Sequence, residues 1–545
     1  MKKLLAILVL AIFPYLAYTQ DVSTGQLSGN FQIEAQSYVT DSVIGAENVP
    51  DKLRSNAYLN LIYTTGKYEI GMRYENYMKP LLGFEQNYEG QGIPYRYATY
   101  KSDFLDVTAG NFYEQFGSGM IFRAYEEWTL GIDNSVDGLR FKVRPSEGIE
   151  FTGIIGKQRL YWDKSRGSIR GGNLELNINE LISGLLPDDY QLTLGGSVIS
   201  KYQADDNSFL NLPENTLAYS TRAELAGSSF NIDVEYSYKY NDPNASNKYN
   251  FNPGSGLLIS GTYFTDGFGL SLMAHRIDNM DFRSDRAARG NELLINYIPP
   301  LTVQHTYGLA SIYPFSTKMN GEAGIQAELT YTIPKDFFLG GSNITLNYAL
   351  VKALDTTWVD KYEYNHNSLF GDRTYFQDMN IEIQTKWSKE FKSLVKYLNI
   401  IYDKDIMENE GAPDYGKVSA DILILDLTYY FNKKHALRTE IQHIWAKQDS
   451  ALIVPDNVNG NWMQVLFEYT IAPNWFFTFY DQYNYGNDKE DNQIHYLNGS
   501  LAYIFKSNRI QLGYGKQRKG ILCVGGVCRA VPASNGFYLS VSSSF

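Results

Sequence analysis

Three basic residues occupy alternate positions of one segment: Arg140, Lys142 and Arg144. Alternate residues of a β-strand share one face, so the three side chains would point the same way. The preceding segment, residues 114–135, contributes Arg123, Glu126 and Glu127. Two interpretations are open: a charged constriction that selects or repels solutes, as in pores, or a buried salt-bridge network that fastens the segment to the strand. We favour the network, because charges shielded from water must be paired.

The chain has two cysteines, and they stand close together in the segment Cys523-Val-Gly-Gly-Val-Cys528. Two intervening glycines allow the chain to close a small disulfide ring, and an exported chain meets an oxidising compartment. Two thiolates alone would bind a metal weakly. We therefore predict a disulfide that stiffens this loop.

Signatures of catalysis are absent from the sequence. No serine has glycine at both second neighbours, and there is no phosphate-binding loop or dinucleotide fingerprint. The six histidines are far apart and never show the paired spacing of a zinc-binding helix. We therefore expect no enzyme, no cofactor and no metal. The net charge of -12 argues against nucleic acid as a partner, since binding phosphates needs a basic surface.

The segments that must position these residues have the period of β-strands. In residues 230–240 every even position is apolar or aromatic and every odd one polar or charged, and residues 26–36 largely alternate in the same way. Runs of this kind have the length that a tilted strand needs to cross hydrocarbon. The 44 Tyr, 29 Phe and 7 Trp would supply aromatic girdles at both membrane interfaces. Since only alternate residues would meet lipid, the mean hydropathy of -0.32 is compatible with a membrane barrel.

Connections between these runs alternate between short turns and longer polar loops, the last near residues 518–534. Counting strands this way gives about 24, with a range of about 22 to 26. The sequence therefore predicts an all-β chain with a single large closed antiparallel transmembrane β-barrel. Two connections, residues 114–135 and 278–319, are too apolar for solvated loops. We expect them to fold inward as plugs or constrictions, because so wide a barrel would otherwise leak.

Both ends of the chain agree with export. A charged start, an apolar run over residues 4–16 and a small-residue end predict a signal peptide over residues 1–20, which leaves 21–545 as the barrel domain. The final strand places four apolar side chains on one parity: Phe537, Leu539, Val541 and Phe545. Chains ending this way resemble bacterial outer-membrane barrels, whose last strand is read by the barrel-assembly machinery. Closure would pair this strand with the first one, which begins near Gln26.

Two longer segments, 110–140 and 513–529, resemble an uncharacterised, porin-like family of outer-membrane β-barrels from Bacteroidetes-type, Gram-negative bacteria. The resemblance extends over the mature chain. It implies a fold and a location in the outer membrane. No activity, and therefore no functional residue, comes with it.

We expect a channel or transport-related pore that is occluded by its own loops, with both termini in the periplasm. The alternative is a non-conducting structural subunit of an outer-membrane secretion or assembly complex. A membrane-embedded hydrolase is least favoured, because no nucleophile motif is present. The expected partners are outer-membrane lipid and lipopolysaccharide, the barrel-assembly machinery and, under the alternative, other outer-membrane proteins.

Overall fold

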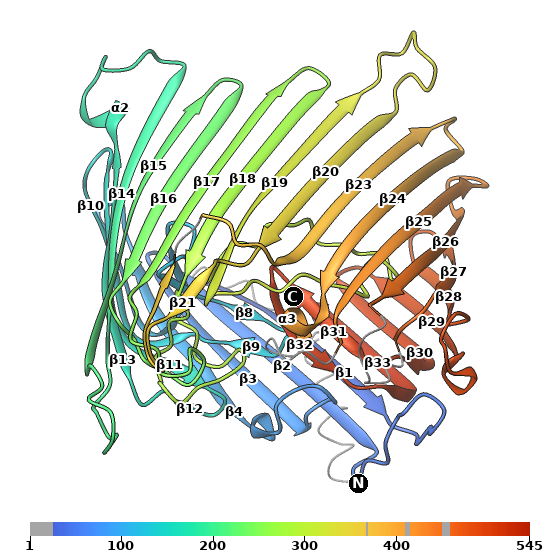
Figure 1. The fold of residues 1–545 in the computed structure, drawn as a ribbon, viewed down its shortest axis with the longest axis horizontal. Helices are drawn as coiled ribbons and strands as arrows, with labels where there is room; N and C mark the ends of the chain where they lie inside the picture. Colours follow the sequence, from blue (N-terminus) through green and yellow to red (C-terminus); the bar gives the residue numbers. More distant parts are fainter. Residues whose placement is uncertain (1–24, 367–368, 409–414, 450–457) are drawn as a thin grey trace.

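The computed structural model describes residues 25–366, 369–408, 415–449 and 458–545; the predicted signal peptide lies outside these ranges. Long antiparallel strands form one sheet that closes into a barrel (Figure 1). The predicted barrel and its count of 24 strands are confirmed. The barrel strands are β1 (Gln26–Ser37), β2 (Leu53–Thr65), β3 (Tyr68–Lys79), β4 (Gly90–Lys101), β5 (Leu105–Phe112), β10 (Val136–Ser146), β11 (Ile149–Leu160), β13 (Ser168–Asn177), β14 (Tyr190–Tyr202), β15 (Asn215–Gly227), β16 (Phe230–Lys239), β17 (Gly254–Thr265), β18 (Phe268–Asp278), β19 (Gly321–Thr332), β20 (Asn343–Lys352), β23 (Thr374–Lys386), β24 (Phe391–Asp403), β25 (Lys417–Tyr430), β26 (His435–Gln448), β27 (Trp462–Ile471), β28 (Trp475–Tyr483), β29 (His495–Phe505), β30 (Asn508–Gln517) and β33 (Ser534–Ser544).

The first and last strands close the barrel, as predicted. β1 pairs with β2 on one side and with β33 on the other, in a register that runs from Asn30 opposite Ser544 to Gln36 opposite Tyr538. Beyond β33, the backbone N–H of Phe545 donates to the carbonyl of Gly29 at 3.0 Å, and the N–H of Gly29 donates back at 2.9 Å. The terminal aromatic residue is thus part of the closing ladder.

The alternation of side chains sets the two faces of the wall. In β16, Ile232 and Val234 point outward and are 46% and 37% exposed, whereas Glu235, Ser237 and Lys239 point inward and are buried. Apolar residues outside and polar residues inside invert the pattern of a water-soluble protein. Exposed aromatic side chains mark both ends of the wall: Tyr63, Phe264, Tyr429, Trp475 and Phe505 at one, and Tyr202, Tyr240, Trp445, Tyr514 and Phe537 at the other.

Short connections and both ends of the barrel chain lie at one end of the barrel, which we call the turn side; the longer connections lie at the loop side. A turn-side connection carries α2 (Ile178–Leu181), and a loop-side one carries α3 (Lys404–Glu408). No helix in the described part of the chain is long and apolar enough to span a membrane. The remaining short elements are η2 (Gln86–Tyr88), β6 (Glu114–Phe116), β7 (Phe122–Ala124), β8 (Glu126–Glu127), β9 (Ile132–Asp133), β12 (Asp163–Lys164), which extends the pairing of β11, β21 (Thr356–Trp358), β22 (Tyr364–His366), η3 (Glu490–Asn492), β31 (Gly520–Val524) and β32 (Val527–Val531).

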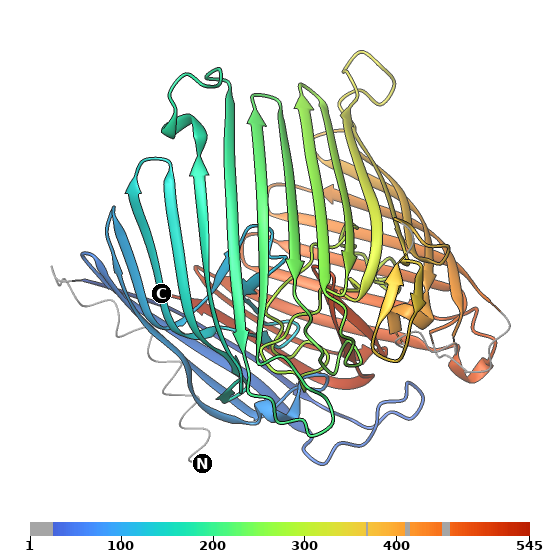
Figure 2. The ribbon, with the colours of Figure 1, turned by 60° about the vertical axis from the view of Figure 1, so that its left-hand side comes forward.

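Three loop-side connections turn back into the ring of strands (Figures 1 and 2). The first insert, 113–135, and the second, 279–320, correspond to the segments that the sequence singled out as too apolar. The third insert, 518–533, corrects the expectation of a polar outer loop at 518–534. It folds inward because its apolar side chains Val524 and Val527 pack on Leu130 and Ile132 of the first insert.

The inserts pack against the loop-side half of the wall. Along β15, the inward-facing Thr216, Ala218 and Ser220 near the loop side are fully buried, whereas Glu224 near the turn side is exposed. The same change from buried to accessible occurs along β17, between Leu258 and Thr262. The loop-side half of the lumen therefore holds the inserts, and the turn-side half is accessible to solvent.

Candidate functional site

A cluster of buried charges joins the first insert to the wall. Arg73 of β3 is its centre and forms ion pairs with Glu75 at 2.7 Å and with Glu126 and Asp133 of the insert. Arg159 of β11 pairs with Glu75 at 2.7 Å and with Asp133 at 2.6 Å. The side chains of Arg73, Arg159 and Glu75 are at most 4% exposed. Two guanidinium groups thus face three carboxylates, two of which come from the insert.

Aromatic rings and charges together set the chemistry of this cluster. The guanidinium of Arg73 lies over the rings of Tyr95 at 4.8 Å and Trp128 at 4.9 Å, which shields it from water. Burial alone would raise the pKa of the Asp133 carboxyl, but the arginines beside it hold that pKa below its usual value. Asp133 is therefore a fixed anion at neutral pH, and the insert is held by full charges.

The predicted basic row has divided roles. Arg140 binds Glu114 of the first insert at 3.1 Å, so it contributes to the attachment. Lys142 and Arg144 both bind Glu150 of the wall, each at 2.9 Å. All five side chains are partly exposed, on the inner face of β10 and β11 and at the root of the insert. One residue of the row thus reaches the insert, and the other two stay paired within the wall.

The remaining predicted residues of this segment lie within the first insert. Glu127 accepts hydrogen bonds from the backbone N–H of Thr129 at 3.0 Å and from its hydroxyl at 2.6 Å. Arg123 lies between two rings, 4.4 Å from the centre of Tyr125 and 4.1 Å from that of Tyr297. Because Tyr297 belongs to the second insert, Arg123 helps to join the two inserts.

The second insert is held by buried lysines of the wall. Lys239 of β16 donates to the backbone carbonyl of Asp281 at 2.6 Å, and Lys201 of β14 pairs with Asp242. Both ammonium groups lie over the ring of Phe282, at 5.9 Å and 5.5 Å. Lysine is rarely fully buried without a partner. The insert thus supplies a carbonyl and an aromatic face to cations that would otherwise lack them.

Further along, the second insert crosses the lumen to the opposite wall. Arg166 after β12 binds Asp285 at 2.6 Å near the start of the insert. Toward its end, the ring of His305 lies 2.9 Å from Asp378 of β23. The insert is therefore attached to distant parts of the ring of strands.

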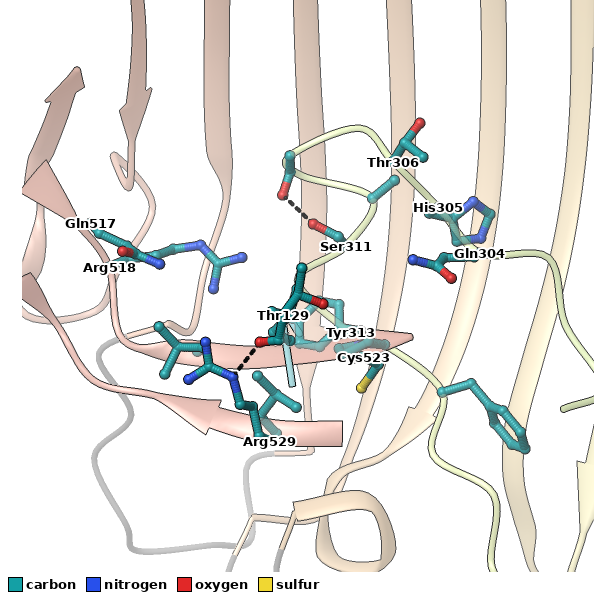
Figure 3. Close-up of a pocket in the computed structure, with 18 of the residues that line it drawn as sticks. Thr129, Gln304, His305, Thr306, Ser311, Tyr313, Gln517, Arg518, Cys523 and Arg529 are labelled. Atoms are coloured by element: carbon teal, nitrogen blue, oxygen red, sulfur yellow. Dashed lines mark hydrogen bonds between the residues drawn. The ribbon is translucent and has the colours of Figure 1, made fainter. Parts of the chain in front are cut away.

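The third insert lies between the other two. Its strands β31 and β32 are joined by a disulfide between Cys523 and Cys528. Asn291 of the second insert donates its amide to the carbonyl of Cys528 at 2.8 Å. Arg529 donates to the carbonyl of Thr129 in the first insert at 2.7 Å (Figure 3). The three inserts thus form one interconnected body.

A cavity of about 680 Å³ remains between this body and the wall (Figure 3). The second and third inserts supply most of its lining; β1, β23, β28, β30, the connection between β3 and β4, and Thr129 of the first insert supply the rest. Its charged lining residues are Glu34, Lys516, Arg518 and Arg529; neutral polar residues include Gln304, Thr306, Ser311 and Gln482. We take the cavity and the inserts around it as the candidate functional site.

The buried cluster around Arg73 and the basic lining of the cavity were not found from the sequence. One signal was present: Arg73 and Glu75 occupy alternate, inward positions of one strand. In the described residues, no group of three or more His, Cys, Asp or Glu side chains is placed to hold a metal ion.

Comparison with known proteins gives the following matches. The model of a family of unknown function (DUF6029) matches residues 1–545. No curated protein matches the chain significantly. Similar solved structures include the siderophore receptor PirA from Acinetobacter baumannii, with 12% identity over 97% of this chain and 81% of that chain and a TM-score of 0.43. They also include the translocation pore of the P pilus usher PapC, with 8% identity over 95% and 99% of the two chains and a TM-score of 0.42.

Proposed function

We propose that this chain, which belongs to the DUF6029 family, is an outer-membrane barrel with a transport-related role, whose lumen is closed by its own three inserts. The observation that carries the proposal is the body of inserts in the loop-side half of the lumen, with a cavity of mixed polar and apolar lining retained beside it. A closed lumen with a retained cavity is what a gated conduit requires.

Placement in a membrane is supported by the outer face of the wall. The outward-facing side chains are apolar along the strands and aromatic at both rims, as in transmembrane barrels. The sequence adds a predicted signal peptide and a final strand that resembles those of outer-membrane barrels. We assign the loop side to the cell exterior, because short turns are periplasmic in bacterial barrels.

Closure of the lumen is supported by the kind of contact that the inserts make. Phe116, Met120 and Phe122 of the first insert are fully buried in an apolar cluster with inward-facing wall residues such as Ile199 and Ala218. A water-filled channel has a polar interior. Apolar packing between insert and wall excludes water there, and the buried ion pairs resist displacement of the insert.

The test is to remove each insert while keeping the barrel. The flanking residues are already hydrogen-bonded strand partners: Phe112 with Val136, Asp278 with Gly321, and Gln517 with Ser534. A short hairpin turn can therefore replace each insert without moving a strand. The matched control replaces the turn-side connection 333–342, which lies outside the loop-side half. Its flanking residues, Thr332 and Asn343, also pair with each other on neighbouring strands.

Single-channel conductance in planar bilayers is the measurement, after each variant is shown to fold by its heat-modifiable migration in gels. We expect the intact protein and the control variant to conduct poorly, and each insert replacement to open a large, stable conductance. A large conductance in the intact protein would overturn closure. If none of the folded insert replacements conducts, the proposal that the barrel is a pore is rejected.

A second function, the non-conducting structural subunit, is favoured by one observation. The lumen contains a second extensive apolar cluster, in which Leu309 and Ile312 of the second insert pack on Ile400, Ile422 and Ile444 of the wall. Such packing resembles a protein core more than a temporary gate. Purification from native membranes distinguishes the two, since a stoichiometric partner favours the subunit.

A further inference from the structure

The cavity beside the inserts has a charge opposite to that of the whole chain. The chain has a net charge of -12. The lining of the cavity contains the cations Lys516, Arg518 and Arg529 and one carboxylate, Glu34, which leaves a formal surplus of two positive charges. A basic chamber in an acidic protein requires an explanation of its own, since charged linings set which ions a pore accepts.

One of the three cations is neutralised within the protein. Lys516 binds Asp41 of the loop between β1 and β2 at 2.8 Å. Arg529 is only partly satisfied: its Nε donates to Thr129 and its plane lies 4.3 Å from the ring of Phe84, but in the described residues its Nη1 has no hydrogen-bond partner.

Arg518 is the least satisfied of the three. Its single hydrogen bond within the described chain is a long one, 3.4 Å, from Nη1 to the carbonyl of the adjacent Lys519. None of the carboxylates in the described residues forms an ion pair with it, and its guanidinium projects into the cavity (Figure 3). Burial lowers the pKa of Arg518, and three nearby tyrosines and the carboxylate of Glu408, which forms no ion pair with it, only partly offset that shift.

We propose that the cavity binds a small anionic solute, through a carboxylate or phosphate group held by the guanidinium groups of Arg518 and Arg529. Arginine does not lose its proton near neutral pH, so Arg518 stays positively charged. An anion from solution can therefore serve as its ion-pair partner. The planar guanidinium matches the two oxygens of a carboxylate or phosphate. This inference rests on the proposed transport-related function, because it names the class of solute.

Neutral side chains around the two arginines suit the same ligand. Gln304 and Gln482 line the cavity and carry amide donors; Gln482 uses one amide N–H on Gln464 and keeps the other. Donors of this kind orient an anion without adding charge, so that binding stays reversible.

The experiment is isothermal titration of the full-length protein in detergent with inorganic phosphate and, separately, with citrate. The variant is Arg518→Gln. The matched control is Arg170→Gln, which removes the same charge from an exposed position at the loop-side rim that does not line the cavity. We expect the intact protein and the control to bind at least one probe, and Arg518→Gln to bind it at least tenfold more weakly. Binding of citrate alone or phosphate alone identifies the group.

Equal binding by the intact protein and Arg518→Gln, or no binding of either probe by the intact protein, would overturn the anion site. If Arg518→Gln does not fold, Arg518→Lys is the second variant, because it keeps the positive charge but loses the planar guanidinium that can hold two oxygens. We expect it to bind the probe more weakly than the intact protein. Unchanged binding would count against the site. Equilibrium binding does not require conduction. If the insert replacements do not conduct but the intact protein binds the anion, only the pore is rejected. If the replacements conduct but the intact protein binds neither probe, only the anion site is rejected.

Discussion

At the scale of single residues, the two faces of one strand predict opposite tolerance to charge. Val234 faces outward and is exposed, whereas its neighbour Asp233 faces the lumen and accepts a hydrogen bond from Asn231. We expect Val234→Arg to lower the free energy of unfolding by about 2 to 4 kcal/mol in lipid, because it places a cation in hydrocarbon. Asp233→Arg should cost much less. Urea titration in lipid vesicles measures both, and similar losses would contradict the assigned faces.

The buried cluster around Arg73 gives a second prediction at this scale. Arg73→Met leaves Glu75 and Asp133 with only Arg159 as a cationic partner, and it removes the cation that pairs with Glu126. We expect a loss of about 3 to 5 kcal/mol in the free energy of unfolding, since an uncompensated buried charge remains.

The control for this variant is Arg96→Met. Arg96 is 54% exposed and forms one longer ion pair, 3.3 Å, with Asp137. An exposed pair contributes at most about 1 kcal/mol. A loss in Arg73→Met as small as in the control would mean that the cluster does not hold the insert.

At the scale of elements, the hairpin of β31 and β32 depends on its cross-link. It packs on both other inserts, and its disulfide closes a short ring. Replacing both Cys523 and Cys528 with Ser should destabilise the folded hairpin by about 2 kcal/mol, the low end for so small a ring. That corresponds to a roughly thirtyfold larger population of the opened hairpin.

Limited trypsin digestion measures this opening, because Lys519 and Arg529 lie in or beside the hairpin. We expect cleavage there to accelerate in the double variant while the barrel strands stay resistant. Cleavage at an unchanged rate would show that packing alone fixes the hairpin.

The elements differ in how far the sequence predicts them. The barrel strands can be predicted because apolar and polar residues alternate with a period of two over their whole length. Closure of the barrel is predicted from the final strand. The first two inserts are readable because their apolar residues have no reason to face water. The third is not, because Arg518, Lys519 and Arg529 give it the composition of a solvated loop. Its destination depends on apolar partners far away in the chain, such as Leu130.

Partners within the candidate site are harder still. Arg73 and Asp133 are sixty residues apart in sequence, and they meet only because strand register and the fold of the first insert bring them together. Alternation shows that Arg73 faces inward, but it does not show which carboxylate it meets. The cavity arises in the same way, from the space that three separate segments leave unfilled.

At the scale of the whole molecule, the barrel has two unlike halves. The loop-side half contains the inserts, the buried cluster around Arg73 and the cavity, and the turn-side half is accessible to solvent. A solute entering from the turn side would meet an open vestibule before the body of inserts. Direction of access therefore depends on how the barrel sits in its membrane.

Orientation is tested by single cysteines at two exposed positions. Phe209, in the loop-side connection between β14 and β15, is 94% exposed, and Phe338, in the turn-side connection between β19 and β20, is 89% exposed. The native cysteines are joined in a disulfide and do not react with maleimides. We expect a membrane-impermeant maleimide to label Phe209→Cys in intact cells and Phe338→Cys only after the outer membrane is permeabilised.

The two variants control for each other, since each exposes one thiol in a connection of comparable length, 203–214 or 333–342, and both should react equally in detergent. The physical reason for the asymmetry is that long polar connections are found outside and short turns in the periplasm. If only Phe338→Cys is labelled in intact cells, the orientation of the barrel in the membrane is the opposite of the one assigned here. The open vestibule would then face the exterior, and the inserts would close the lumen from the periplasmic side.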